Sequence, residues 1–565
     1  MIAAGIAVLL LSSMQALADP AASLPRKKLI ATGWDNPATD GFRRAASVFA
    51  KWPFDGAVVE PAAEGAPEEL GSRPFRSAHG RQPWKREWFA RAAEDLRAGL
   101  AAGPRDVFLA VNANPGDVDW FDDPGWRSIV DHWRIAAWIA KRGGARGLLF
   151  DPEPYVKPHE QFAYRAQAGH GSRTFAEYAA KARERGGEVM RAVGAEFPDA
   201  VILNYFLLSF LLDTTEGGDP ARALPSHGYG LLPAFLDGWL DEIPPAMALV
   251  DGCEEGYYLT SPAEFLDRAV RIKGAAQALV APGNRAKYRA QVEVGFGIYL
   301  DAYANPEGSK YYIGGGGRSR TEWLEANVAS ALRASDRYVW IYGEEGRWWP
   351  LPAGEQAKYR TWPEVLPGCD RVLAFVRDPV DAARRRVGEL RAAGTLKELA
   401  RNGGFDAKKA QENEGRAPDW KSSEAPPGWD FWQDEATSKG ASGWDREAGA
   451  GGPGSARMSG VADGCFIQKH PVRPGERVFA AASVRWRGRG EPYLTMRWQD
   501  ARGKWIAWDK DATAFPAAGG EAWHAVEVTA TVPAGAGYLV LLPGVKGQES
   551  ADDTVWFDDV HVWKY

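Results

Sequence analysis

Short apolar runs alternate with longer amphipathic segments from residue 27 to about residue 390. The short runs have the length and composition of buried strands, and the longer segments have the spacing of amphipathic helices. One helix is expected at 174–197, where Thr174 and Glu177 have the spacing of a capping box, and another at 321–335, with a weaker cap at Thr321. The apolar runs predict eight strands, at 27–34, 55–61, 106–112, 145–153, 200–206, 247–255, 292–303 and 338–345.

Eight alternations of strand and helix predict the α/β class and a (β/α)8 barrel of the TIM type over residues 27–395, with elaborated loops. An open doubly wound sheet is the competing interpretation. No glycine-rich phosphate loop follows the first strand, which favours the barrel.

The pattern changes after residue 400. Residues 401–460 are rich in Gly, Pro, Ser and charge and have no helical period. Later runs alternate apolar and polar residues between turn signals, as in a sandwich of strands. We therefore expect a C-terminal all-β jelly-roll sandwich over residues 399–565, with strands at 476–488, 493–500, 524–533, 536–544 and 554–565.

Composition narrows the functional classes. Of 565 residues, 45% are hydrophobic and 25% charged, and the net charge of −6 gives no reason to expect nucleic acid or an anionic membrane as a partner. The three cysteines, Cys253, Cys369 and Cys465, lack the spacing of a disulfide framework or a zinc cluster. The 25 tryptophans suit either sugar stacking or a large core. We expect a monomer.

The N-terminus predicts export. Residues 1–18 contain an apolar run that ends in Ala16-Leu17-Ala18, an A-x-A cleavage site, although the usual basic residue at the start is missing. The run is short for a membrane span. A signal peptide at 1–18 implies a secreted or periplasmic protein with no membrane attachment after cleavage.

Two motifs at the ends of the C-terminal segment carry a resemblance. "RNGGFD" at 401–406 and "VWFDDVHV" at 555–562 resemble the first and last strands of the family four, nine and sixteen carbohydrate-binding modules. The resemblance implies a β-sandwich joined to a secreted polysaccharide-degrading enzyme. It also implies a structural calcium held by Asp406 and by Asp558 or Asp559, and oxygen ligands suit this hard cation. The alternative, that Asp558 and Asp559 only end a strand, stays open.

Four tryptophans of this segment are candidate sugar platforms. Because successive strand residues face opposite sides of a sheet, some of the four must belong to the core. They are Trp486, Trp498, Trp505 and Trp508.

Barrel enzymes place their chemistry where the strands end. The predicted strand ends carry carboxylates, amides and aromatics but no histidine, since His159, His170 and His227 fall in connecting segments. Metal-dependent barrel enzymes generally need imidazole ligands there. The strand ends therefore favour catalysis by carboxylates with no cofactor. Besides the candidates named below, they include Asn36, Glu60, Asn114, Asp251, Glu254, Tyr303, Tyr342 and Glu345.

Glycoside hydrolysis needs one protonated and one ionised carboxyl group. In "FDPEPY" the alternation places Asp151 and Glu153 on one face, where mutual proximity would raise one pKa. We choose Glu153 as general acid/base, with Asp151 to orient it or tune its pKa. Glu344 leads as the partner, ahead of Glu255 and Asp301. The D-x-E spacing resembles the end of the chitinase motif, but Leu149 replaces its earlier Asp.

The sequence thus predicts a secreted glycoside hydrolase that cleaves a polysaccharide or complex glycan. Any one carboxylate after a strand can instead be a helix cap or an ion-pair partner. Two other hypotheses remain: a non-catalytic glycan-binding protein and a metal-dependent barrel hydrolase. The expected substrate-binding residues are Trp34, Asp35, Asn112, Tyr155, Asn204, Tyr205, Arg347, Trp348 and Trp349.

Overall fold

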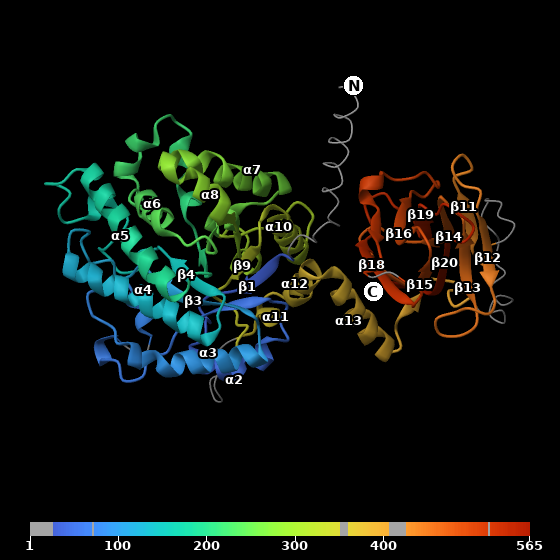
Figure 1. Cartoon of the computed structure of the whole chain (residues 1–565), viewed down its shortest axis with the longest axis horizontal. Coiled ribbons are helices and arrows are strands. Elements are labelled where there is room, and N and C mark those ends of the chain that lie inside the picture. The colour runs from blue at the N-terminus through green and yellow to red at the C-terminus, as the bar shows by residue number, and fades with distance from the viewer. Residues whose placement is uncertain (1–25, 71–72, 351–359, 406–424, 518–519) are drawn as a thin grey trace, which may run out of the picture. The chain divides into compact units, whose positions relative to one another are not determined.

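The computed structural model describes residues 26–70, 73–350, 360–405, 425–517 and 520–565 (Figure 1). The chain forms two compact units, Met1–Arg377 and Asp378–Tyr565. We predicted a boundary between residues 395 and 399, and the difference is helix α13, Pro379–Ala392. Its buried Ala383 and Val387 pack with Phe479 and Trp563 of the second unit. The predicted signal peptide lies outside the described residues.

The first unit contains a nearly closed sheet of parallel strands in the order β7-β6-β5-β4-β3-β2-β1-β9-β8. The α/β class and the parallel barrel are confirmed, and each strand lies within or close to a predicted apolar run. The strands are β1 Lys28–Ala31, β2 Gly56–Val59, β3 Asp106–Asn112, β4 Gly147–Asp151, β5 Val201–Asn204, β6 Ala248–Asp251, β7 Val292–Val294, β8 Phe296–Tyr299 and β9 Tyr338–Tyr342.

The sheet has nine strands, so the predicted number of eight is wrong. The predicted strand at 292–303 is divided at Gly295 into β7, which pairs with β6, and β8, which pairs with β9. Gly295 donates its N–H to the Asp251 carbonyl, and a Cβ there would lie 2.9 Å from the Val250 side chain. The two ends of the strand order meet at this one glycine.

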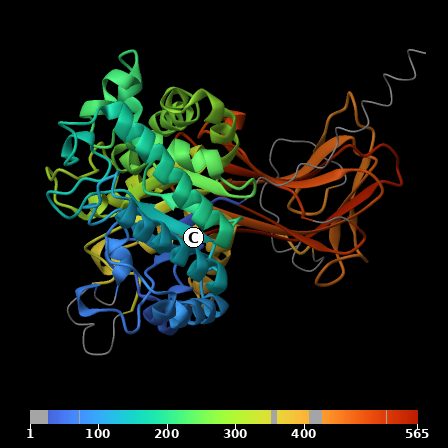
Figure 2. The same cartoon turned by 60° about the vertical axis from the view of Figure 1, so that its left-hand side comes forward.

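Helices surround the strands of the first unit (Figures 1 and 2). The capping box of α5 forms between Thr174 and Glu177 as predicted. That of α10 forms two residues earlier than expected, between Ser319 and Glu322, because Glu322 supplies the reciprocal acid. The helices are α2 Thr39–Phe49, α3 Ala90–Ala102, α4 Asp123–Gly143, α5 Phe175–Glu196, α6 Leu232–Glu242, α7 Pro262–Lys273, α8 Arg285–Gln291, α9 Asp301–Ala304, α10 Arg320–Ala334, α11 Trp362–Val365 and α12 Cys369–Arg377.

Much of the tryptophan content belongs to the cores. Trp133, Trp239 and Trp340 are fully buried in the first unit and Trp498 in the second. Burial of such large side chains is a main source of core stability. No helix in the described ranges is long and apolar enough to cross a membrane.

The second unit contains two antiparallel sheets, seen as two layers in Figure 2. One has the order β12-β13-β20-β15-β18, with β10 beside β20, and the other β11-β14-β19-β16-β17. Apolar residues from both sheets form one core. The jelly-roll connection stays a prediction. The strands are β10 Lys397–Glu398, β11 Asp430–Gln433, β12 Ala441–Asp445, β13 Ser455–Ser459, β14 Asp463–Pro471, β15 Arg477–Arg487, β16 Glu491–Gln499, β17 Ala512–Ala514, β18 His524–Thr531, β19 Tyr538–Lys546 and β20 Thr554–Lys564.

Candidate active site

The end of β4 carries the predicted carboxyl pair. Asp151 is buried, and its carboxylate accepts hydrogen bonds from the Glu153 backbone N–H and from Asn112 Nδ2, both at 3.0 Å. Glu153 Oε2 accepts a hydrogen bond from the Tyr155 hydroxyl at 2.5 Å. Asn114 holds the segment in place, because its amide donates to the Glu153 carbonyl and accepts from the Tyr155 N–H. The structure therefore brings these five predicted rim residues together.

The two carboxyl groups interact electrostatically. Burial, followed by the charge of Glu153, raises the pKa of Asp151 to about 7. This is the effect expected when a carboxyl group leaves water and lies close to a second carboxylate.

A tight turn after β6 leads from the buried Asp251 to a third carboxyl group of the site, that of Glu254. The buried Asp251 carboxylate accepts the N–H groups of Leu207 and Ser209, at 3.1 and 2.8 Å. Gly252 is required because a Cβ would lie 2.1 Å from the Asn204 carbonyl oxygen. Cys253 follows in the left-handed region, with φ 42°, which is uncommon for a residue with a side chain. The chain then enters the 3₁₀ helix Glu254–Tyr258, so that Glu254 is its first residue.

Glu254 is the most perturbed carboxyl group of the site. Burial raises its pKa to about 9, and the charges of Glu153 and then Asp151 act in the same direction. Within the part of the chain that the structure describes, its buried Oε2 has no hydrogen-bond partner. An unpaired buried carboxyl group is costly, and such groups are concentrated at functional sites. Glu254 therefore retains a proton at neutral pH, within electrostatic reach of Glu153.

The cavity beside the end of β4 is lined by Asp151 but, among the described residues, by neither Glu153 nor Glu254. This cavity of about 740 Å³ has Asp151, Asn112, Tyr155, Tyr205 and Trp34 in its wall. The Tyr205 hydroxyl lies 2.7 Å from Thr32 Oγ1, and its ring stacks on Trp340. Trp34 is 68% exposed, which leaves a face of its indole open to a ligand. Size and lining are typical of a pocket for a small polar ligand.

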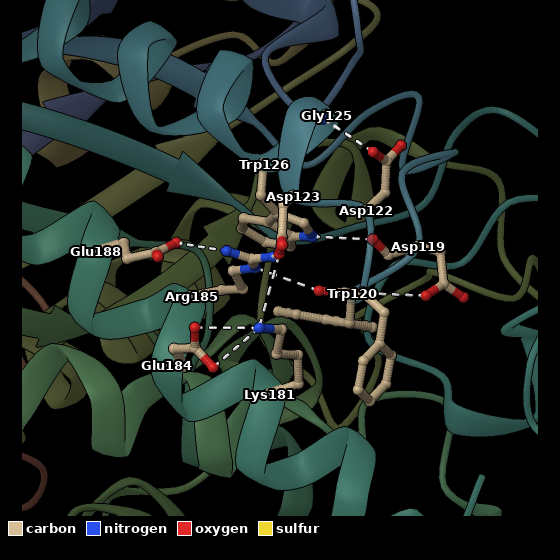
Figure 3. Close-up of polar contacts among 11 residues, drawn as sticks. Asp119, Trp120, Asp122, Asp123, Gly125, Trp126, Lys181, Glu184, Arg185 and Glu188 are labelled. Atoms are coloured by element: carbon tan, nitrogen blue, oxygen red, sulfur yellow. Dashed lines mark hydrogen bonds and ion pairs between the residues drawn. The ribbon is translucent and has the colours of Figure 1, made fainter.

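A buried arginine holds the loops behind the site (Figure 3). Arg185 of α5 donates to the Trp120 carbonyl at 3.2 Å and pairs with Glu188 and Asp123. Trp120 in turn donates its indole N–H to the Gln161 carbonyl at 3.0 Å. The network connects the segment after β3 with the segment after β4, and these two segments carry Asn114 and Tyr155.

Several predicted residues have structural partners instead. The buried Asp301 accepts the N–H groups of Glu344 and Glu345 at 2.9 Å. Burial, then the charge of Asp301, raises the pKa of Glu344, whose side chain bonds to Tyr299. Glu255 forms an ion pair with Arg268. Of these three acids, Glu255 also adds its charge to the raised pKa of Glu254, after Glu153 and Asp151.

The tryptophans after β9 pack inward. Trp349 stacks on Phe49 with ring centroids 3.9 Å apart, and Trp348 contacts Phe54 edge to face. Both are nearly buried. Asp35 accepts their backbone N–H groups at 2.7 and 3.2 Å, and burial raises the pKa of Asp35 to about 6. Asp35 and the two tryptophans fix a loop, and Asp35 and Trp349 also line a cavity of about 1110 Å³.

Two further predicted residues have different surroundings. Asn204 is fully buried and donates to the carbonyls of Ile202 and Val250. Arg347 pairs through its backbone with Arg360 and lines the same cavity of about 1110 Å³, which shares Trp34 and Asn36 with the cavity that contains Asp151. Among the residues that the structure describes, no group of three or more His, Cys, Asp or Glu side chains could hold a metal ion.

Sequence reasoning placed Glu254 at the rim but did not select it. Tyr257 and Tyr229, which lie within electrostatic reach of the same acids, were also missed. The sequence feature that points to Glu254 is the pair of glutamates after β6. Among the described residues, Glu255 of this pair forms an ion pair with Arg268 and Glu254 forms none.

The second unit has an aromatic groove of about 940 Å³ on the sheet that contains β14, β16 and β19. Trp432, Trp505, Trp508 and Phe515 line it and are 48%, 39%, 80% and 61% exposed. Of the four candidate platforms, Trp505 and Trp508 lie in this groove. Trp498 is fully buried, and the half-buried Trp486 packs against the core.

The predicted calcium site is described only in part, because Asp406 lies outside the described residues. One Asp558 carboxylate oxygen accepts the Ala450 N–H and the other the Asp559 N–H, both at 2.7 Å. Each carboxylate oxygen has two lone pairs, so these hydrogen bonds leave an acceptor position on both oxygens for a cation. The calcium stays a prediction that rests on the resemblance.

Comparisons with known proteins extend to solved structures only, since no family model and no curated protein matches the chain. One similar structure is a family 4 carbohydrate-binding module, with 17% identity, a TM-score of 0.20 and coverage of 29% of this chain and 98% of that one. Another holds the CBM22-1 and GH10 modules of a Clostridium thermocellum endo-1,4-beta-D-xylanase with xylohexaose, with 14% identity, a TM-score of 0.20 and coverage of 24% and 26%.

A third similar structure is the enzymatically active domain of Bacteriophage CBA120 tailspike protein 4. It has 16% identity and a TM-score of 0.20, and the match covers 24% of this chain and 19% of that domain. The structure neighbours thus include carbohydrate-binding modules and a xylanase. Likenesses of this size carry no argument about activity.

Proposed function

We propose that the barrel unit is a glycoside hydrolase in which Glu254 is the general acid and Glu153 the ionised partner. The observation that carries the proposal is the convergence of Asp151, Glu153 and Glu254 after two barrel strands, with a proton retained on Glu254. Glycoside hydrolysis requires a protonated and an ionised carboxyl group on either side of the bond to be cleaved.

The environments of the two glutamates support different roles. Glu254 is partly buried, and among the described residues its buried Oε2 has no hydrogen-bond partner, so it keeps its proton until the leaving oxygen can take it. Glu153 accepts a hydrogen bond from the Tyr155 hydroxyl, which orients its carboxylate. It would act as nucleophile or as base toward water, depending on its separation from Glu254. Asp151, held by Asn112, adds negative charge that favours the proton on Glu254.

We further propose that the second unit binds glycan through its aromatic groove. The exposed faces of Trp505 and Trp508 suit stacking on apolar sugar faces, and Arg497 and Asp511 in the same groove can contact hydroxyl groups. This groove also supports the second candidate function, a glycan-binding protein without catalysis. We also propose that residues 1–18 are a signal peptide that directs export of the chain.

The test is release of reducing ends from a panel of polysaccharides by the full chain. We expect the wild type to hydrolyse at least one member and Glu153→Gln to lose at least about a hundredfold in rate, the usual contribution of a general acid or base. Binding through the second unit should persist in the variant. A wild type that binds glycan but hydrolyses nothing would leave only the binding function.

A further inference from the structure

Apart from the cavity of about 1110 Å³ already described, another cavity, here called the second cavity, lies on the rim of the barrel unit, beside the ends of β6 and β8. It has a volume of about 330 Å³, and six of its eleven lining residues are aromatic. Polar groups converge there too, including Thr260 and Lys310, whose ammonium group lies 4.7 Å from the centre of the Tyr311 ring. Such a mixture of aromatic faces and a few polar groups is typical of ligand sites. The aromatic residues are Tyr257, Tyr258, Tyr299, Tyr311, Tyr312 and Trp323.

Two elements join this cavity to the proposed catalytic acids. The 3₁₀ helix that begins at Glu254 ends at Tyr258, in the cavity wall. Tyr257, on the same helix, stacks on Tyr299 with ring centroids 5.2 Å apart. Any ligand in the cavity therefore lies within one short helix of Glu254.

Tyrosine rings connect the two cavities in an unbroken series. Tyr205 and Tyr342 both line the cavity that contains Asp151, with ring centroids 6.2 Å apart. Tyr342 lies 5.9 Å from Tyr299, and Tyr299 lies 5.6 Å from Tyr311. The last step, from Tyr311 to Tyr258, is 6.1 Å. We call these five residues the tyrosine band.

The outer end of the band is not required by the core. Tyr258 is 55% exposed, whereas Tyr205 at the inner end is only 7% exposed. Aromatic side chains exposed in a cavity are commonly binding groups, because their faces stay available to a ligand.

We propose that the second cavity is a sugar-binding subsite that holds the glycan chain beyond the catalytic carboxyl groups. The inference rests on the proposed function, because it takes the catalytic cavity to hold a sugar. It deepens that function by assigning the substrate class: an extended oligosaccharide or polysaccharide held along the tyrosine band. Tyr311 and Tyr258 supply the stacking faces at the outer end, and Lys310 supplies a hydrogen-bond donor at the rim.

The test measures binding on a microarray of disaccharides and hexasaccharides from xylan, cellulose and β-1,3-glucan. The parent protein is the full chain with Glu153→Gln, which prevents turnover, and with Trp505→Ala and Trp508→Ala, which weaken binding by the second unit. Into this parent we introduce Tyr311→Ala, and Tyr311→Phe as the matched control that keeps the ring. Thermal unfolding verifies that each variant is folded.

We expect the parent to bind at least one hexasaccharide and Tyr311→Ala to weaken this binding about tenfold, the effect of one lost stacking contact. Tyr311→Phe should stay within about twofold, since the stacking face remains. Disaccharide binding should be unchanged. The subsite is overturned if the parent binds no hexasaccharide, or if Tyr311→Ala affects neither length or both lengths equally.

The outcomes separate this subsite from the proposed catalysis. If the wild type hydrolyses no polysaccharide while the length-dependent loss holds, catalysis is refuted and the subsite stands. If the wild type hydrolyses glycan and Tyr311→Ala loses nothing on long chains, only the subsite is refuted.

Discussion

Replacing Glu254 by glutamine should make the protein more stable at neutral pH. Glu254 is partly buried, its Oε2 has no hydrogen-bond partner among the described residues, and burial with the charges of Glu153 and Asp151 raises its pKa from 4.5 to about 9. The folded state therefore keeps this proton over a pH range in which the unfolded chain releases it. A residue retained at a cost in stability is typical of an active site.

The sign and size of the effect follow from proton linkage. Below pH 4.5 both states hold the proton, so wild type and Glu254→Gln should be equally stable. Between pH 4.5 and about 9, each pH unit lowers the stability of the folded wild type by up to about 1.4 kcal/mol. At pH 7 the upper limit is about 3 kcal/mol, and partial solvent access reduces it to about 2 kcal/mol. For a unit of this size the gain corresponds to about 2–3 °C in Tm.

The assay is thermal unfolding of wild type and Glu254→Gln from pH 4 to pH 8. The difference in Tm should be near zero at pH 4 and should grow with pH. Glu264→Gln is the matched control, because backbone hydrogen bonds at the start of α7 lower the pKa of Glu264, the opposite direction. This control should show no gain at high pH. An unchanged or lower Tm for Glu254→Gln at pH 7 would refute the description of Glu254 as an unpaired buried acid.

Three further predictions concern the neighbouring groups. Tyr155→Phe should lower kcat about tenfold to a hundredfold, because it removes the hydrogen bond from the Tyr155 hydroxyl to Glu153. A hydrogen bond to a charged group is worth about 1.5–3 kcal/mol. An unchanged kcat would exclude the hydroxyl from catalysis. Arg185→Met should lower the unfolding free energy by about 2–3 kcal/mol in denaturant titrations, because Asp123, Glu188 and the Trp120 carbonyl lose their guanidinium donor. Full stability would show that the network is dispensable. Trp508→Ala should weaken retention on polysaccharide about tenfold in affinity electrophoresis with no change in Tm, whereas equal retention would exclude this platform.

The strands and their ends could be predicted because apolar runs fix where a strand is buried and where it stops. Asp151 and Glu153 were identifiable on this basis, since they follow Phe150 directly. The choice between Glu254 and Glu255 could not be made, because it depends on the left-handed conformation of Cys253 and on Arg268, which is 13 positions beyond Glu255. The periodicity of a sequence does not show which of two adjacent acids in a tight turn points inward.

Long-range packing explains the other differences. Trp348 and Trp349 follow β9 and looked like sugar platforms, but Asp35 holds their backbone and Phe49 covers Trp349, contacts across more than 290 residues. The predicted strand at 292–303 is divided at Gly295 because its two parts pair with different strands, β6 and β9. The sequence of this segment alone does not encode how the barrel closes. Strands β10 to β14 and β17 were not predicted. Five of these six have two to five residues, and β11 to β13 lie in a segment rich in Gly and Pro, whereas the nine-residue β14 directly follows that segment.

The most direct test of the proposed catalytic pair is the ratio of kcat values for Glu254→Gln and Glu344→Gln on the same hydrolysed polysaccharide. Glu344 is the fitting comparison because sequence reasoning favoured it, its pKa is also raised by burial, and its backbone N–H is held by Asp301. We predict that Glu254→Gln loses at least about a hundredfold and that Glu344→Gln stays within about threefold of wild type. A large loss in Glu344→Gln with near wild-type turnover in Glu254→Gln would contradict the proposed pair.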